Sequence, residues 1–401
     1  MLRVLHICYL DSGGAGRATV RLHQALNNLD VDSKLLVLYK NTSESKVYKY
    51  EQKDKLLIRL LKKFGIKQTA KQKHKKCISE FKKTYFIYTS PKSDYKVDKH
   101  ELVEWADIIH LHWVSGFVDY KSFLKSVSKP VVWTIHDKNP TLGGFHLLID
   151  KKRNEKNPII NLEKAHSNYK RLAYKQHNNL TVVAPSKFLA DYSSKSKLLG
   201  SFKHHHIYNS IDVNLFYPKN NKELRKSYEI ENDKTVLLFM SEGLDHKHKG
   251  IHLLISALKK MDLSNTILIT VGSGNVEGVE NVISFGKVQD DNKLCELYSI
   301  ADAVIIPSLE DNLPNVMLEA MACGTPVIGT PIGGMIDVIQ DGITGIKSEG
   351  VEPVQIREAI ETYLNTKDKF NSDVIRNYAV SNFIASKQAS AYLKIYKSIK
   401  S

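Results

Sequence analysis

The sequence predicts an α/β protein that contains two doubly wound parallel sheets. Short apolar runs that end in turns alternate with helical stretches, and this alternation is typical of parallel strands joined by helical crossovers. The series occupies the first half of the chain and starts again near residue 236. The chain has 401 residues, 42% of them hydrophobic, so it is long enough to fill the cores of two domains.

The apolar runs define the expected strands, and two similar halves imply a cleft. The strands are expected at 4–8, 34–38, 108–112, 131–135 and 180–184, and then at 236–240, 266–271, 282–285, 303–306 and 326–328. Val20, Leu22, Ala25 and Leu26 have the spacing of an amphipathic helix, which completes a first βαβ unit. A last apolar-periodic helix is expected over roughly 373–399.

Targeting and redox features point to a protein that is not exported. Only Arg3 precedes the apolar run at 4–10, and a turn follows that run in place of a cleavage site, so a first strand is expected there and not a signal peptide. No segment approaches the roughly 20 apolar residues needed to cross a bilayer. The four cysteines show no paired spacing, which predicts a reducing compartment and no structural zinc.

The net charge of +15 is concentrated in one segment. Between residues 53 and 83 there are many lysines and few acids, and Leu56, Leu57, Leu60, Leu61 and Phe64 recur among them at helical spacing. A basic amphipathic helix of this kind suits an anionic membrane surface. A core-facing helix with a solvated basic back is the alternative. Nucleic acid is a weaker candidate, because no aromatic stacking platform accompanies the charge.

Two carboxylates flank a loop-to-helix transition in the second half. The expected strand 303–306 leads to Asp311, a short helix is expected over 316–323, and Glu319 lies within it before Gly324 closes it. Open α/β sheets bind ligands at the carboxyl ends of their strands, where one acid can hold a ribose and another a second sugar. The alternative is that Asp311 or Asn312 only caps the helix and that Glu319 is a solvated side chain.

Two other strand ends carry candidate residues. Gly13-Gly14-Ala15-Gly16 follows the first strand and starts a helix, so a diphosphate or sugar could approach the backbone there, although a tight turn needs glycine in any case. His136 and Asp137 follow the strand at 131–135. An imidazole at this position can donate a hydrogen bond to a sugar hydroxyl or to the acceptor, whereas a lone histidine is more often structural.

Together these motifs resemble one enzyme family. Asp311-x7-Glu319 is similar to the E-x7-E signature of family 4 retaining glycosyltransferases, which have the GT-B fold. The glycine turn resembles the family's G-G-A loop, and Lys249-Gly250 resembles the K-G of its R-x5-K pair. Trp133-Thr134-Ile135-His136-Asp137, followed by Gly143-Gly144-Phe145-His146, resembles the W-T-x-H-D…G-G-x-H stretch of bacterial exopolysaccharide and colanic-acid-type members.

Weaker matches extend over most of the chain. Gly272-Ser273-Gly274 and Phe285-Gly286-Lys287-Val288 are similar to the family's G-x-G and F-x-G-x-V, and 209–218 is similar to its N-G-I-D…F-x-P linker. The resemblance implies two Rossmann-like domains that face a cleft. These are an acceptor-binding domain at 1–206 with the basic insertion at about 51–85, a nucleotide-sugar domain at 207–377, and a helix at 378–401 that crosses back to the first domain.

The resemblance also implies roles for individual residues. His136, Asp311 and Lys249 would be catalytic, with Glu319 on the ribose, Asp311 on the donor sugar, and His136 on the sugar and the acceptor. The acceptor would contact Gly13, Gly14 and His136. The donor would contact Gly14, Lys247, Lys249, Gly274, Lys287, Val288, Asp311, Asn312, Asn315, Val316 and Glu319.

The chain departs from the family pattern at two points. The Arg of the R-x5-K pair is absent, because Gly243 stands six residues before Lys249, and Lys247 or a backbone amide is expected to substitute. The cysteines near the G-G-x-H stretch of the subgroup are also missing. No Asp-x-Asp metal motif follows a strand in the expected place, so Lys249 and helix amides would stabilise the leaving group in place of a divalent ion.

The implied reaction is metal-independent transfer from a UDP- or GDP-sugar, with retention, to a lipid-linked oligosaccharide in cell-surface polysaccharide assembly. No cofactor or nucleic acid is expected, and the basic helix would hold the enzyme on the inner face of the cytoplasmic membrane. A nucleotide-sugar epimerase with the same architecture is one alternative. A non-catalytic nucleotide-sugar-binding protein is the other, because the missing Arg and the Asp at the first acidic position could reflect lost activity.

Overall fold

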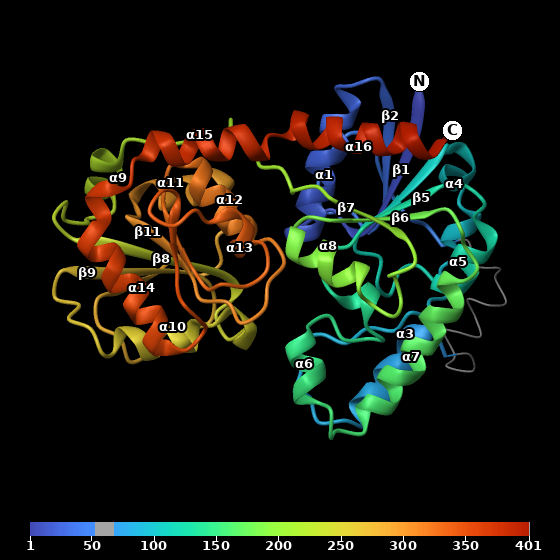
Figure 1. Ribbon diagram of the computed structural model, residues 1–401, viewed down its shortest axis with the longest axis horizontal. Helices are drawn as coiled ribbons and strands as arrows, with labels where there is room; N and C mark the ends of the chain where they lie inside the picture. Colours follow the sequence, from blue (N-terminus) through green and yellow to red (C-terminus); the bar gives the residue numbers. More distant parts are fainter. Residues whose placement is uncertain (53–67, 401) are drawn as a thin grey trace. The chain divides into compact units, whose positions relative to one another are not determined.

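The computed structural model describes residues 1–52 and 68–400, which form two compact units (Figure 1). The first unit comprises Met1–Pro185, Leu189–Ile207 and the chain from Gln388 onward, and the second comprises Ser186–Phe188 and Tyr208–Lys387. Each unit contains its own parallel sheet, so the predicted α/β fold with two doubly wound sheets is confirmed. The second unit extends to Lys387, beyond the predicted boundary at residue 377.

Within the described residues, the sheet of the first unit has the strand order β3-β2-β1-β4-β5-β6-β7, and every pair is parallel. The strands are β1 Leu2–Leu10, β2 Val31–Tyr39, β3 Val47–Lys49, β4 Ile108–Leu111, β5 Val131–Thr134, β6 Leu180–Ala184 and β7 Lys203–His206. The strand order reverses direction between β1 and β4, which is the switch point where open α/β sheets bind ligands. The sequence did not predict β3 or β7, because β3 is short and β7 is Lys-His-His-His without an apolar residue.

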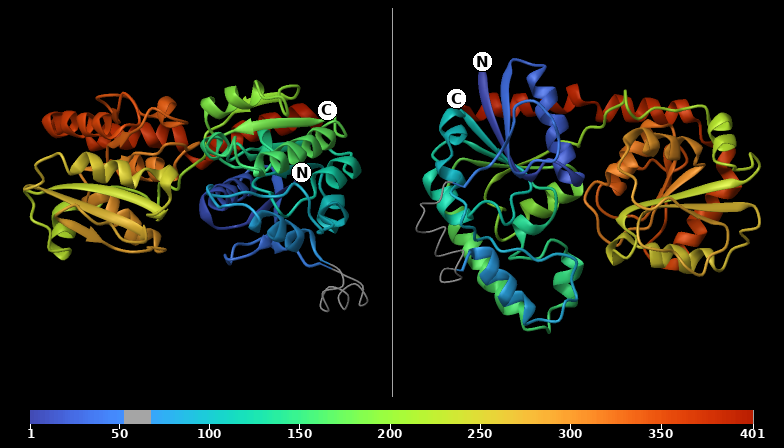
Figure 2. Two further views of the ribbon diagram at one scale, coloured as in Figure 1. Left: turned by 90° about the horizontal axis from the view of Figure 1, so that it is seen from below. Right: turned by 180° about the vertical axis from the view of Figure 1, so that it is seen from behind.

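Helices cover both faces of this sheet (Figure 2). On one face, strand residues such as Leu5 and Ile109 pack with Phe123 and Tyr174 of the helices. On the other face, Cys8 and Leu35 pack with Val20. The helices are α1 Gly13–Asn27, α3 Ala70–Ser79, η1 Val97–Lys99, α4 Glu101–Trp105, α5 Tyr120–Ser126, η2 Asn139–Thr141, α6 Leu148–Arg153, α7 Ile159–Tyr174 and α8 Lys187–Ser194.

The sheet of the second unit has the order β10-β9-β8-β11-β12-β13 among the residues that the structure describes, again with parallel pairs. The strands are β8 Thr235–Gly243, β9 Thr266–Ser273, β10 Val282–Ser284, β11 Ala303–Ile306, β12 Val327–Gly329 and β13 Gly345–Lys347. The helices are α9 Asn221–Ser227, η3 Lys247–Lys249, α10 Ile251–Leu258, α11 Asp291–Ile300, α12 Asn315–Ala322, α13 Met335–Val338, α14 Pro353–Thr366 and η4 Lys367–Lys369.

The single terminal helix predicted over roughly 373–399 is wrong, because two helices replace it. They are α15 Ser372–Phe383 and α16 Ala385–Lys400, and the backbone is extended at Ile384 between them. The Ile211 amide donates to the Phe383 carbonyl at 2.8 Å, and Ile211 pairs with Ile384 as an isolated bridge. The Ile211 amide therefore binds the Phe383 carbonyl, which an amide of the same helix would bind if the helix were continuous. From Gln388 onward the chain belongs to the first unit.

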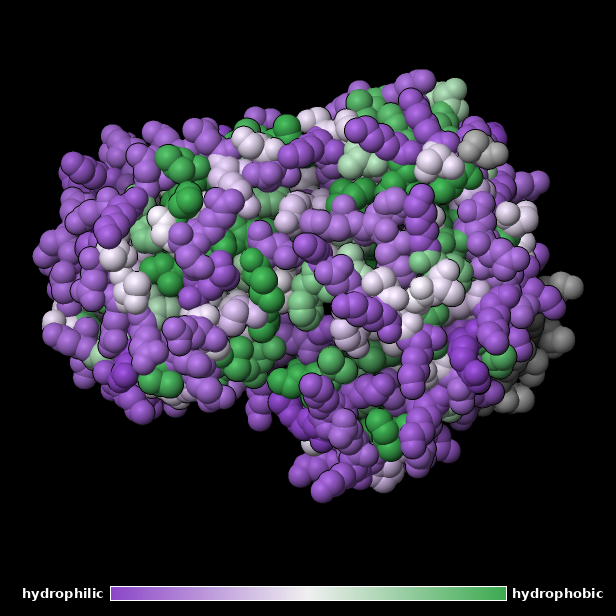
Figure 3. Space-filling view, in the orientation of Figure 1, coloured by the Kyte–Doolittle hydropathy of each residue, from purple (hydrophilic) through white to green (hydrophobic). Residues whose placement is uncertain are grey.

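The predicted basic insertion is described only in part. Its apolar positions, from Leu56 to Phe64, lie outside the described residues. The described part contains α3, which starts with a capping box between Thr69 and Gln72 and has no fully buried residue. Its lysines Lys71, Lys73, Lys75 and Lys76 are exposed. Hydrophilic residues cover much of the face in Figure 3, with apolar residues scattered among them. Among the described residues, no helix has the length and apolar character needed to cross a membrane.

A glycine fixes the pairing of the last strand in the second sheet. Gly345 begins β13 opposite Val327, and a Cβ atom at position 345 would lie 1.9 Å from the Val327 carbonyl oxygen. Only a residue without a side chain allows this approach. The glycine at position 345 is therefore required by the neighbouring strand.

We expect Gly345→Ala to lower the free energy of unfolding of the second unit by about 1–3 kcal/mol, because the added methyl overpacks the contact between β12 and β13. Chemical denaturation followed by circular dichroism measures this change. Ile343→Ala is the matched control, since Ile343 is 48% exposed two residues earlier and its truncation should change stability by less than about 0.5 kcal/mol. Equal effects of the two substitutions would contradict the strand approach.

Candidate functional site

The predicted site residues fall into two groups, one in each unit. Gly13, Gly14 and His136 belong to the first unit, and the predicted donor-binding residues from Lys247 to Glu319 belong to the second. Gly13 opens α1 with φ of +67° directly after β1. A Cβ at Gly16 would lie 2.6 Å from the Leu10 carbonyl oxygen, so this glycine is required by the close approach of helix and strand.

His136 follows β5 and is partly buried. Its Nε2 lies 3.3 Å from Nδ1 of His112. Burial lowers the pKa of His136 to about 4, although Asp137 opposes this change. The imidazole is therefore neutral near pH 7, where it can donate one hydrogen bond and accept another.

Asp137 holds the loop after β5 together. Its carboxylate accepts hydrogen bonds from Nδ1 of His146 at 2.6 Å, from Nε1 of Trp113 at 2.8 Å and from the Asn139 amide at 2.8 Å. Burial raises the pKa of Asp137, but His146 and these hydrogen bonds outweigh it and keep the pKa below its ordinary value. The fixed carboxylate thereby orients Trp113 and His146 relative to each other.

The glycine pair of the same loop is required by packing. The amides of Gly143 and Gly144 donate to the buried Glu163 carboxylate at 2.7 and 2.6 Å. A Cβ at Gly143 would lie 2.1 Å from the Glu163 carbonyl oxygen, and one at Gly144 would lie 2.3 Å from the Tyr88 ring. The Gly-Gly-x-His pattern thus reflects a loop that folds over Glu163 and delivers His146 to Asp137.

A cavity of about 430 Å³ lies next to this loop in the first unit. Aromatic rings, hydroxyl groups and charged side chains share its lining, which includes Tyr9, Tyr88, Tyr95, Trp113, Thr89, Ser90, Ser115, Asp94, Lys71 and Lys92. Trp113 belongs both to the cavity and to the Asp137 network. Rings beside polar groups suit a ligand that has apolar faces and many hydroxyls.

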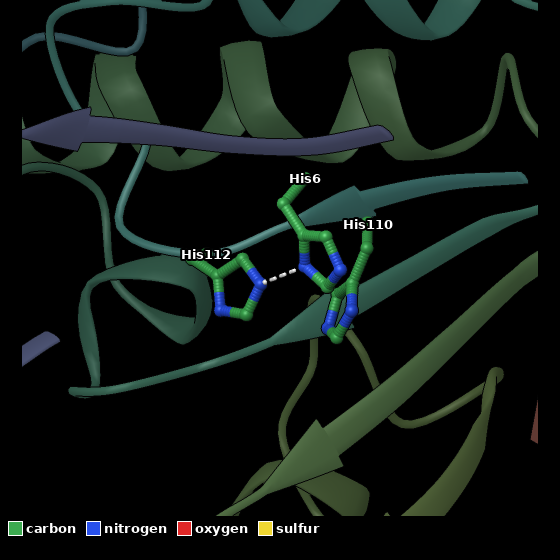
Figure 4. A group of neighbouring side chains, drawn as sticks. All are labelled: His6, His110 and His112. Carbon is green, nitrogen blue, oxygen red and sulfur yellow. Dashed lines mark hydrogen bonds between the residues drawn. The ribbon is translucent and has the colours of Figure 1, made fainter. Parts of the chain in front are cut away.

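Three histidines form a buried cluster that the sequence reasoning did not select. His6 of β1 pairs in register with His110 of β4, and His112 follows two residues later (Figure 4). His6 Nδ1 and His112 Nε2 are 2.9 Å apart. His110 contacts the Tyr396 hydroxyl at 2.6 Å and Thr134 Oγ1 at 2.7 Å. The available signal was a polar residue repeated with period two in a strand that is otherwise apolar.

These histidines are also the residues best able to hold a metal ion. Each offers a nitrogen, and the three nitrogens lie within 4.8 Å of one another. However, hydrogen-bond partners already occupy five of the six ring nitrogens, and the exception is His6 Nε2. The hydrogen bonds therefore account for the cluster without a metal ion.

In the second unit, Lys249 and Asp311 form an ion pair. Lys249 Nζ lies 2.6 Å from Asp311 Oδ2, and both side chains are partly exposed. Gly250, between Lys249 and α10, has φ of +77°, and a Cβ there would lie 1.8 Å from the Pro307 carbonyl oxygen. Glycine thus lets the start of α10 approach the residues after β11, which brings Lys249 to Asp311.

The capping and solvation alternatives for the two acids are wrong. The N-cap of α12 is Pro314 without a side-chain cap, and Asp311 accepts from the neighbouring Asn312 amide at 2.8 Å. Glu319 is 5% exposed and accepts from the Tyr298 hydroxyl at 2.7 Å. A buried carboxylate is costly unless it has a partner, and the Tyr298 hydroxyl supplies one.

The remaining predicted donor residues lie on several elements of the second unit. Asn312 accepts from Ser186 Oγ at 2.5 Å, and its carbonyl accepts from the Gly334 amide at 2.5 Å. Asn315 and Val316 open α12. The others are Lys247 in η3, Gly274 just after β9 with φ of +112°, Lys287, which is exposed, and Val288, which packs on the core.

Side chains of the following loop lie close to position 243, where the family pattern has arginine. A Cβ at Gly243 would lie 2.7 Å from His246 Nε2 and 2.9 Å from Asp245 Oδ1. The rings of His246 and His248 stack with centroids 5.8 Å apart, and burial lowers the pKa of His248 to about 4. The loop before Lys249 therefore fills the space at position 243 with its own imidazole.

Residues 220–379 match the family model described as glycosyl transferases group 1. The matched residues all lie within the second unit. An uncharacterized glycosyltransferase of Methanocaldococcus jannaschii is 28% identical over 66% of this chain and 67% of its own length. An uncharacterized 41.2 kDa protein in the cps region of Klebsiella pneumoniae is 26% identical over 73% of this chain and 79% of its own.

Another relative matches a shorter stretch of the chain. N-acetyl-alpha-D-glucosaminyl L-malate synthase of Bacillus anthracis is 28% identical, and the match spans about half of each protein, namely 48% of this chain and 54% of the synthase.

Solved structures show the same fold. Sucrose-phosphate synthase from Thermosynechococcus elongatus has a TM-score of 0.68 at 16% identity and covers 100% of this chain, with 99% of its own chain aligned. Anabaena HepE in complex with UDP-glucose has a TM-score of 0.64 at 17% identity, with 99% of this chain and 100% of HepE aligned. At these identities the likeness concerns the fold alone.

We expect stability to fall as the pH decreases below about 6.5. Burial is the main cause that lowers the pKa of His6, His110 and His112 well below the ordinary value. As the pH decreases, the unfolded chain therefore binds protons before the folded protein does. The free energy of unfolding is highest above about pH 6.5, and below that pH it falls by about 1.4 kcal/mol per pH unit for each imidazole. Chemical denaturation at pH 7.5 and pH 5.5 measures this loss.

Two variants assign that pH dependence to the cluster. His110→Gln should reduce the slope of unfolding free energy against pH by the share of one imidazole. His252→Gln is the matched control, because His252 is exposed on α10 and lies outside the cluster. The same slope in both variants would show that the buried cluster does not stay neutral.

Proposed function

We propose that the chain is a retaining glycosyltransferase that uses a UDP- or GDP-linked sugar as donor and a lipid-linked oligosaccharide as acceptor in cell-surface polysaccharide assembly. The observation that carries the proposal is the Lys249–Asp311 pair after strands β8 and β11, with the buried Glu319 in the helix that follows. An ammonium next to the start of α10 suits a leaving diphosphate, which carries negative charge.

The second unit would bind the donor. In this proposal Asp311 holds hydroxyls of the donor sugar and keeps Lys249 in place, and Glu319, oriented by Tyr298, holds the ribose. Lys247, Gly274, Lys287, Val288, Asn312, Asn315 and Val316 would complete the donor contacts. HepE, a protein of the same fold, has been solved with UDP and with UDP-glucose, which supports a nucleotide-sugar donor.

The first unit would bind the acceptor. Gly13 and Gly14 open α1 with backbone amides that a diphosphate or a sugar can approach, and His136 follows β5, which is separated from β1 by β4 in the same sheet. The cavity lined by Tyr9, Trp113 and Asp94 offers aromatic faces and polar groups to an oligosaccharide. We assign acceptor binding to this surface.

The proposed reaction retains the configuration at the anomeric carbon. The bond from that carbon to the diphosphate oxygen breaks, a bond to the acceptor oxygen forms on the same face, and the acceptor proton passes to the departing phosphate. No protein carboxylate is then needed as a nucleophile. Lys249 and the amides that start α10 would stabilise the leaving diphosphate in place of a divalent ion, so we expect the reaction to proceed in chelator.

A donor screen followed by a transfer assay tests the function. A nucleotide sugar at 100 times its dissociation constant adds about 2.7 kcal/mol to stability, so thermal shifts should single out one donor. That donor should be consumed only when a polyprenyl-diphosphate oligosaccharide is added, and the product should keep the anomeric configuration of the donor. Epimerised donor without acceptor would favour the epimerase, and binding without consumption would favour a non-catalytic protein.

We expect Lys249→Ala and His136→Ala each to lower turnover by about 10²- to 10³-fold, because each removes a contact that strengthens in the transition state. Binding of UDP should weaken only modestly in His136→Ala. Lys260→Ala is the matched control, since Lys260 is exposed after α10 and should keep wild-type turnover. Near-wild-type turnover in either site variant would remove that residue from the proposed mechanism.

The lysines of α3 suit an anionic membrane surface, and on this basis we propose that the enzyme is peripheral on the inner face of the cytoplasmic membrane. Changing Lys71, Lys73, Lys75 and Lys76 to Glu should abolish most sedimentation with phosphatidylglycerol vesicles at low salt. The matched control reverses the same number of charges in the second unit, at Lys222, Lys226, Lys259 and Lys260, which are also exposed. Equal losses in both variants would refute a specific role for α3.

A further inference from the structure

A chain of imidazoles leads from the interior of the first sheet to the candidate catalytic histidine. His6 Nδ1 lies 2.9 Å from His112 Nε2, and His112 Nδ1 lies 3.3 Å from His136 Nε2. The rings of adjacent members stack, with centroids 5.2 Å apart for the first pair and 5.5 Å for the second. The middle residue, His112, uses both of its nitrogens in the chain, so its two contacts are coupled.

All three imidazoles are neutral at pH 7, because burial lowers the pKa of each below its ordinary range. A neutral imidazole carries one ring hydrogen and has one bare nitrogen. Each contact in the chain needs a ring N–H on one side and a bare nitrogen on the other, since two hydrogens or two lone pairs that face each other at these distances repel. The position of one hydrogen therefore sets the position of the other two.

Only two arrangements satisfy both contacts. In the first, every hydrogen is on Nδ1, so His6 donates to His112, His112 donates to His136, and His136 carries its own hydrogen on Nδ1. In the second, every hydrogen is on Nε2, so His136 donates to His112 and His112 donates to His6. The second arrangement leaves a hydrogen on His6 Nε2 and a bare Nδ1 on His136.

His6 Nε2 decides between the two arrangements. This atom is buried and has no hydrogen-bond partner among the described residues. An orphaned N–H in the interior is rarer and more costly than a bare acceptor, because the donor forfeits a hydrogen bond that water would have given it. The arrangement with a bare Nε2 on His6, and with all three hydrogens on Nδ1, is therefore favoured.

We infer that His6 and His112 are positioning residues that hold His136 as the neutral Nδ1–H tautomer, so that His136 donates a hydrogen bond to a sugar or acceptor oxygen and does not act as a base. The tautomer follows from contacts within the first unit. The ligand that receives the hydrogen bond rests on the proposed function.

This tautomer agrees with the proposed route of the acceptor proton. A His136 that presents Nδ1–H cannot take a proton at that nitrogen, so the proton of the attacking hydroxyl must leave by another path. In the proposed reaction it passes to the departing phosphate oxygen, and atoms and charge balance without a protein base. The chain of imidazoles would thus restrict His136 to donating a hydrogen bond and would prevent it from acting as a base.

The first test observes the tautomers directly. Histidines labelled with ¹⁵N in the full-length protein report protonated and bare ring nitrogens by separate chemical shifts, and His136→Gln identifies the signals of residue 136. We expect a protonated Nδ1 and a bare Nε2 on His136 at pH 7.5. The opposite pattern would overturn the inference, and so would one equivalent of tightly bound transition metal in elemental analysis, because the nitrogens would then be ligands.

Two substitutions at position 112 separate positioning from packing. His112→Asn places an amide nitrogen near the former Nδ1 and should keep the His136 tautomer and turnover within about threefold of wild type. His112→Leu, of similar size and without a donor, should shift the His136 Nδ1 signal toward the bare value and lower kcat by about tenfold with little change in donor KM. Equal turnover in the two variants, both folded by circular dichroism, would refute positioning by His112.

The outcomes also separate this inference from the proposed function. A protonated His136 Nδ1 in a protein that transfers no sugar would leave the histidine arrangement intact and overturn the proposed function with the ligand assignment. Sugar transfer by a protein whose His136 Nδ1 is bare would keep the function and overturn the inference alone.

Discussion

The structure depends on one geometric constraint, which is that the strands of a parallel sheet all end at the same edge. Lys249 and Asp311 are 62 positions apart in the chain, yet their side chains meet at 2.6 Å because each follows a strand of the second sheet. His112 and His136 meet after β4 and β5 of the first sheet for the same reason. Each unit thus brings together polar groups that the sequence separates, next to an extended apolar core.

Most of the fold could be predicted because its strands are buried on both faces and form continuous apolar runs. Three strands escaped notice, since β3 and β13 are three residues long and β7 consists of lysine and histidine. Their position is set by pairing with a neighbour and not by their own side chains. The break at Ile384 was missed as well, because apolar periodicity continues through it and only the bridge to Ile211 interrupts the helix.

The candidate site shows the same division between local and tertiary causes. The positions of Asp311, Lys249 and His136 at strand ends followed from local patterns. The burial of Glu319 under Tyr298 did not, because a single acid in a short helix resembles a solvated side chain until the partner is known. His6, His110 and His112 were overlooked because the sequence does not show which histidines of different strands lie side by side. The register of β1 with β4 places His6 next to His110.

The last helix has a consequence for how the protein is made. Tyr392 and Tyr396 of α16 bond to Thr134 and His110 in the middle of the first sheet, whereas the second unit lies between them in the chain. During synthesis, the ribosome therefore exposes a first unit that still lacks its closing piece. The second unit can fold once Lys387 has emerged, but the hydroxyl contacts of the first unit remain unmade until α16 follows.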